Sequence, residues 1–106
     1  MTRKEIHKLE NQLVEHAWQK AQKVWADGSK EIDYVERLDY CQAWTYQTKG
    51  YAFLVSCEAI VAFVYDNYNM FDVLRLVYGY MTTSAKHIAK FRNKFRHVSE
   101  HTWGEV

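Results

Sequence analysis

The feature that most constrains the fold is the spacing of apolar residues near the N-terminus. From Ile6 to Trp25 these residues recur every three or four positions, which is the repeat of an amphipathic α-helix. Their positions cover about half of the helix circumference, more than the stripe of about 100° needed to pack against one surface. We therefore expect a long helix that contacts more than one neighbour. Thr2 and Glu5 have the spacing of a capping box at its start, and Gly28 is expected to end it in the left-handed conformation.

The segment from residue 29 to residue 40 allows two interpretations. Its apolar residues fit a helix capped by Ser29, and they also fit a strand that is interrupted at Glu36. We favour the short helix.

From Cys41 onward, β-branched and aromatic residues dominate, which favours strands. Trp44 and Tyr46 would share one face of the first strand because alternate side chains point the same way. Further strands are expected at 51–55, 59–65 and 71–78, with turns at 49–50 and 66–69. The nearly continuous apolar run at 59–64 predicts a central strand covered on both faces, by helices on at least one.

After Gly79, the hydroxyl residues Thr82, Thr83 and Ser84 are candidate N-caps of a last helix. Its buried stripe would consist of Ala85, Ile88, Phe91, Phe95 and Val98. Residues 99–106 are expected to be frayed, with Trp103 as an anchor. The chain of 106 residues suits one domain, residues 1–106. The predicted fold class is α+β: a long N-terminal helix, an antiparallel sheet of about four strands, and a C-terminal basic amphipathic helix, with the helices in one layer.

The net charge of +1 excludes a histone-like or strongly acidic protein, but the charge is unevenly distributed. Residues 73–99 carry a net charge of +6 and no carboxylate. The basic residues of the last helix are Lys86, Lys90, Arg92, Lys94 and Arg96, with His87 and His97 expected beside them on the exposed side. This basic ridge is either a solvated face partly neutralised by Asp33, Glu36 and Asp39, or a docking surface for phosphate or an acidic protein.

Aromatic residues could extend such a surface. Tyr78 and Tyr80 precede the basic helix and could stack on bases, although tyrosines at strand ends are commonly half-buried. Trp44 and Tyr46 could anchor a protein interface, and the alternative is an ordinary solvated sheet face with cross-strand aromatic pairs.

No motif predicts catalysis or a cofactor. Four possible zinc ligands are Cys41, Cys57, His97 and His101, but the cysteines lie sixteen residues apart, so they do not form a compact zinc knuckle. The segment 79–86 lacks the second glycine and the Lys-Ser/Thr pair of a phosphate-binding loop. The longest apolar run is too short to span a membrane, and the cysteine content and the charged N-terminus suggest a reducing cytoplasm. We therefore expect a non-enzymatic cytoplasmic protein without a cofactor.

The segment 78–91, YGYMTTSAKHIAKF, resembles the C-terminal signature of small phage proteins, in which a Tyr-rich turn leads into Thr-Thr/Ala-Ser-x-x-His-Ile-x-Lys-Phe. The likeness extends upstream over residues 59–77. The resemblance implies a phage or prophage protein expressed in a bacterial host cell. By analogy with the anti-CRISPR proteins, such a protein would bind and inhibit a bacterial defence or regulatory complex, of which a CRISPR nuclease is one candidate. The alternative is a small phage regulator that binds nucleic acid through the basic helix.

Overall fold

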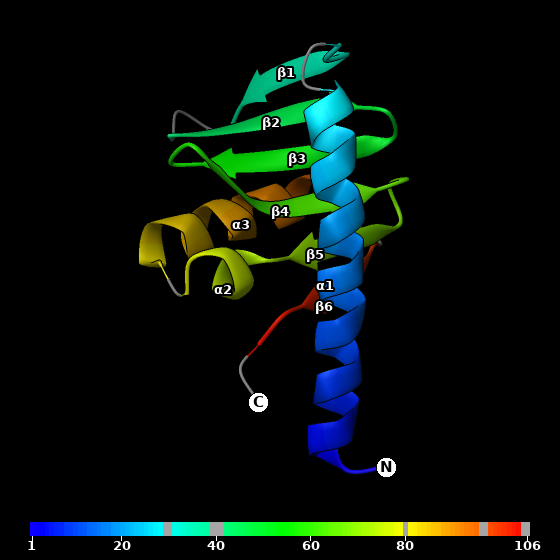
Figure 1. Cartoon of the computed structure of the whole chain (residues 1–106). Helices are drawn as coiled ribbons and strands as arrows, with labels where there is room; N and C mark the ends of the chain where they lie inside the picture. The colour runs from blue at the N-terminus through cyan, green and yellow to red at the C-terminus, as the bar shows by residue number, and fades with distance from the viewer. Residues whose placement is uncertain (29–30, 39–41, 80, 96–97, 105–106) are drawn as a thin grey trace.

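The structure is a computed structural model that describes residues 1–28, 31–38, 42–79, 81–95 and 98–104. It has the predicted α+β class, with a long N-terminal helix, a sheet and a C-terminal helix (Figure 1). In chain order the elements are α1 (Arg3–Gly28), β1 (Tyr34–Arg37), β2 (Ala43–Thr48), β3 (Tyr51–Ser56), β4 (Ala59–Tyr65), β5 (Asn69–Asp72), α2 (Leu74–Val77), α3 (Thr82–Lys94) and β6 (Ser99–Thr102).

The sheet has six strands in the order β1-β2-β3-β4-β5-β6. Neighbouring strands are antiparallel except β5 and β6, which are parallel, so the sheet is mixed. The prediction of about four antiparallel strands missed the strand at each edge. The short helix favoured for 29–40 is wrong, because Tyr34–Arg37 pair with β2 as an edge strand. The frayed tail is also wrong, because residues 99–102 pair with β5.

The two faces of the sheet are covered by different helices. Phe53 and Phe63 point to the face where α1 packs, whereas Leu54 and Val64 point to the face where α3 packs. The prediction that the central strand is covered on both faces is therefore confirmed. The single layer of helices is corrected to one helix layer on each face, because β3 and β4 are apolar on both sides. Figure 1 shows that α1 runs across the strands and that its N-terminal end projects beyond the sheet.

The strand expected at 71–78 ends early. The carboxylate of Asp72 accepts a hydrogen bond from the backbone N–H of Leu74 at 3.1 Å, and the chain turns there into the short helix α2. Burial raises the pKa of the Asp72 carboxyl group, opposed by that hydrogen bond and by nearby arginines. Leu74 is buried on the α3 side and Leu76 packs on the α1 side, so a helical turn buries side chains in both cores.

The predicted turns are confirmed. Lys49 and Gly50 have φ values of 49° and 81°, and Asp66 and Asn67 have φ values of 51° and 64°. Positive φ at both central residues gives a turn whose twist matches that of the paired strands.

The two ends of α1 differ in how well they were predicted. The backbone N–H of Glu5 donates to the Thr2 hydroxyl at 3.1 Å, as the capping box requires. Gly28 is the last residue of the helix and lacks the expected positive φ. Its Cβ, if present, would lie 2.7 Å from the Thr48 hydroxyl oxygen, so a side chain is excluded there by close packing on β2 rather than by backbone conformation.

Candidate functional site

The basic ridge predicted for the last helix lies on the exposed side of α3. Its buried stripe is confirmed, since Phe91 is fully buried in the core. The Nζ of Lys94 lies 2.7 Å from a carboxylate oxygen of Glu36, and the Nε of Arg92 lies 2.5 Å from one of Glu100. Strands β1 and β6 thus place carboxylates against the helix.

The remaining predicted contact residues are divided between the two faces of the sheet. Tyr46 packs edge-on against Trp25 of α1, with the ring centroids 5.4 Å apart. Trp44 points to the same face as Tyr46 and is partly exposed, with the guanidinium group of Arg37 5.9 Å from its ring. Tyr78 is half-exposed at the end of α2. Lys86 is exposed and Lys90 is half-buried on α3, whereas Tyr80 and Arg96 lie outside the described residues. Trp44 and Tyr46 therefore do not form one continuous surface with α3, which packs on the opposite face.

A buried polar cluster joins β3 to α3. The Ser56 hydroxyl lies 2.7 Å from Nδ1 of His87 and 2.9 Å from the Ser84 hydroxyl. His87 is only 5% exposed, so the expectation that it faces solvent is wrong, and burial together with nearby Lys90 lowers its pKa. Ser56 is 1% exposed, so a substrate cannot reach its hydroxyl, and the cluster fastens a helix to the sheet.

This cluster also corrects the predicted caps of α3. Met81 occupies the N-cap position without a side-chain cap, and Thr82 is the first helical residue. Ser84 is buried against Ser56, which lies 28 residues earlier in the chain. No local sequence pattern marks such a long-range contact.

The C-terminal segment is bound to α1 by polar side chains. The Asn11 amide donates to the Gly104 carbonyl at 2.6 Å, and the Gly104 N–H donates back to Asn11 Oδ1 at 3.0 Å. Glu10 contacts Nδ1 of His101 at 3.0 Å, and Glu15 accepts from the Trp103 indole at 3.2 Å. Two carboxylates of α1 are therefore turned towards the C-terminal segment, and Trp103 anchors it as expected.

The four residues considered as possible zinc ligands are not brought together among the described residues. Cys41 and His97 lie outside the described residues. Both ring nitrogens of His101 have partners, Glu10 and Asn69. Within the part of the chain that the structure describes, no group of three or more His, Cys, Asp or Glu residues could hold a metal ion.

The N-terminal half of α1 carries an apolar stripe that consists of Ile6, Leu9 and Leu13. These side chains are 55%, 51% and 45% exposed, respectively. Their spacing of three and four residues places them in one line along the helix. The sequence pattern predicts that this line is apolar, but it does not show that the sheet ends before covering it.

The apolar stripe leads into a pocket of about 230 Å³ between α1 and the sheet, called here the helix–sheet pocket. It is lined by Leu13, His16, Ala17, Lys20, Tyr51, Phe63, Tyr65 and Phe71. Strands β3, β4 and β5 supply its aromatic residues, and α1 supplies the two basic side chains. Burial, followed by the influence of Tyr65 and Asp66, raises the pKa of the Tyr51 hydroxyl group. The hydroxyl therefore stays protonated and can donate a hydrogen bond at neutral pH.

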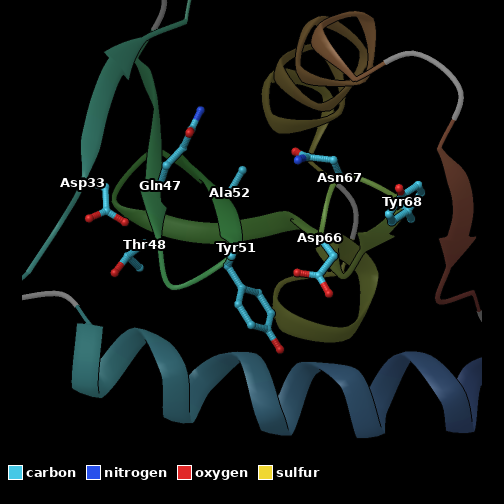
Figure 2. A pocket seen from close by; sticks show the side chains of 9 residues that line it. Asp33, Gln47, Thr48, Tyr51, Ala52, Asp66, Asn67 and Tyr68 are labelled. Atoms are coloured by element: carbon cyan, nitrogen blue, oxygen red, sulfur yellow. The ribbon is translucent and has the colours of Figure 1, made fainter.

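A second hollow of about 330 Å³ lies around the turns at 49–50 and 66–67. Figure 2 shows that Tyr51 points towards α1, whereas Gln47 points away from it, and that Tyr68 lies at a distance from Asp33. Because the polar side chains do not converge on one point, this hollow lacks the geometry of a binding site.

No family model, curated protein or solved structure matches this chain. We therefore infer function from the geometry of the chain itself. Among the described residues, no helix is both long enough and apolar enough to cross a membrane.

Proposed function

We propose that this chain is a non-enzymatic binding protein that holds an apolar, acidic segment of another protein along the N-terminal half of α1. The proposal is supported chiefly by one observation: the apolar stripe is half-exposed, whereas Val14 and Ala21 of the same helix are fully buried. A contiguous apolar patch of this kind is characteristic of protein interaction sites.

The exposed stripe offers a useful binding energy. Complete burial of a leucine or isoleucine side chain contributes about 1.5–3 kcal/mol, so covering the exposed halves of Ile6, Leu9 and Leu13 would contribute roughly 2–4 kcal/mol. Aromatic contacts in the adjoining pocket would add to this. Binding along an exposed helix by an apolar segment of a partner is a common mode of recognition.

The charges of α1 favour an acidic partner. Its basic residues are Arg3, Lys4, Lys8, Lys20 and Lys23, and its acidic residues in the same range are Glu5, Glu10 and Glu15. Glu10 and Glu15 contact the C-terminal segment. Lys20 lines the adjoining pocket together with Leu13 of the stripe, so this cation favours an acidic group at that end of a bound segment.

A second copy of this chain fits the stripe less well. Antiparallel packing about Leu9 and Leu13 would bring Arg3 of one chain near Lys20 and Lys23 of the other. Parallel packing would place each lysine beside its own copy. Like charges at such distances are destabilising.

The identity of the partner stays a prediction. The phage-like signature of 78–91 suggests a bacterial defence or regulatory complex as the target, with inhibition by occupying its surface. The alternative function, direct binding of nucleic acid through α3, also stays a prediction. It is weakened because Arg92 and Lys94 already have carboxylate partners.

The test compares two surfaces of the same protein. Wild type, an α1 double variant (Ile6→Gln, Leu9→Gln) and an α3 double variant (Lys86→Gln, Lys94→Gln) are immobilised and exposed to bacterial host lysate, with and without nuclease. All four positions are exposed, so circular dichroism should show the same fold for each protein.

We expect a protein that wild type and the α3 variant retain, with or without nuclease, and that the α1 variant loses. A protein that the α1 variant retains and the α3 variant loses would overturn the proposal. Capture that disappears with nuclease would favour the nucleic-acid alternative. A dimer of wild type that the α1 variant abolishes would replace the partner with a second copy.

A further inference from the structure

We propose that the helix–sheet pocket receives an aromatic side chain of the bound segment, and that Lys20 and His16 hold a carboxylate beside that ring. This inference rests on the proposed function, since it describes the segment that the apolar stripe would bind. It assigns the pocket a ligand chemistry, an aromatic group with an adjacent anion.

The floor of the pocket favours a flat ring. The rings of Tyr51 and Tyr65 have centroids 4.8 Å apart, and those of Phe63 and Phe71 have centroids 5.0 Å apart. Phe63 and Phe71 are opposite each other in the register of β4 and β5, as are Tyr51 and Tyr65 in that of β3 and β4. Phe63 and Phe71 are buried, and Trp18 and His101 stack on them. Tyr51 and Tyr65 are partly exposed, so a further ring can contact these two tyrosines.

The size of the pocket restricts the ligand. Its volume of about 230 Å³ lies below the roughly 300 Å³ at which pockets for drug-sized molecules begin. The space therefore suits one ring system rather than an extended molecule. Leu13 lies both in this lining and in the apolar stripe, so a segment bound along the stripe can reach the pocket with one side chain.

The polar groups on the two sides of the pocket decide the orientation. His16 and Lys20 line the helix side of the pocket, one turn apart and both exposed to solvent. Asp66 follows Tyr65 on the sheet side and acts on the Tyr51 hydroxyl. An anion is therefore attracted to the wall formed by α1 and repelled from the turn at 66–67, whereas a cation would be oriented the opposite way.

The pocket can be tested without the partner. The probes are 2-naphthoate and 2-naphthylmethylamine, which share a ring system and differ in the sign of their charge. Backbone amide shifts in nitrogen–proton correlation spectra of the full chain report the site and the affinity. The variants are Lys20→Met, which removes charge from the lining, and Lys23→Met, a matched control on the same helix outside the lining.

We expect naphthoate to shift the amides of Leu13, Ala17 and Lys20 and to bind more tightly than the amine. Lys20→Met should weaken the binding of naphthoate by up to about five-fold, the upper end of the range for an exposed ion pair, while Lys23→Met leaves it unchanged. Equal affinity for both probes, an equal effect of the two lysine variants, or shifts confined to other surfaces would overturn the assignment.

The two proposals can fail separately. If the α1 double variant loses a protein partner but naphthoate does not bind at the pocket, the ligand chemistry is wrong and the docking surface stands. If naphthoate binds as described but the partner is retained by the α1 double variant, the pocket is a site for a small aromatic acid and the docking surface is wrong.

Discussion

Replacement of Ser56 by alanine should lower the free energy of unfolding more than replacement of its neighbour Ser84. Ser56 contacts both Ser84 and His87, so Ser56→Ala leaves two buried polar groups without that partner. Each such group costs about 1–3 kcal/mol, which gives roughly 2–6 kcal/mol for the variant. Ser84→Ala removes one contact and leaves the hydrogen bond between Ser56 and His87 intact, so it should cost about 1 kcal/mol.

The measurement is urea unfolding at pH 8, followed by tryptophan fluorescence. Thr83→Ala is the matched control because Thr83 is exposed next to Ser84, and its effect should stay within about 0.5 kcal/mol. The free energies of unfolding should fall in the order Thr83→Ala, Ser84→Ala, Ser56→Ala from least to most destabilised. If Ser84→Ala costs as much as Ser56→Ala, the serine at β3 is not the centre of the cluster and the reasoning fails.

Two further predictions concern buried polar groups. Because burial lowers the folded-state pKa of His87 below its ordinary value of 6.5, the unfolded chain takes up that proton first as the pH falls. The stability contributed by neutral His87 should therefore be lost as the pH falls below this ordinary value, with a slope of at most about 1.4 kcal/mol per pH unit. The variant His87→Gln should remove this part of the slope when urea unfolding is measured between pH 7.5 and 5.5. The Thr45 hydroxyl is buried without a hydrogen-bond partner among the described residues, so Thr45→Val should stabilise the protein by about 1–2 kcal/mol, and a lower melting temperature would contradict this.

The elements that the sequence predicted well are those whose signal is local. The apolar repeat of α1, the stripe of α3 and the turn at 49–50 each depend on residues within a few positions of one another. The two edge strands lack such a signal. Tyr34–Arg37 are all exposed, so their pairing with β2 depends on backbone hydrogen bonds that no side-chain pattern records.

The sequence shows which side chains are apolar, but it predicts less well which of them the rest of the fold covers. Leu13 and Val14 belong to the same predicted helix face, yet Val14 is fully buried and Leu13 is 45% exposed. The difference arises because consecutive helical side chains point about 100° apart, so Val14 faces the sheet and Leu13 lies at the margin of the contact. Where that margin falls depends on how the sheet packs on the helix. The apolar stripe therefore could not be recognised as an exposed surface before the fold was known.

The C-terminal strand connects the prediction about α3 with the surface found on α1. Glu100 in β6 contacts Arg92 and so adds a carboxylate to the predicted basic ridge. On the other side of the same segment, His101 and Trp103 contact Glu10 and Glu15 of α1. The C-terminal segment thus makes α3 less basic and is itself held on α1 by two acidic side chains. Since this strand pairs with residues some thirty positions earlier, local charge counts assigned the cationic surface to the last helix alone.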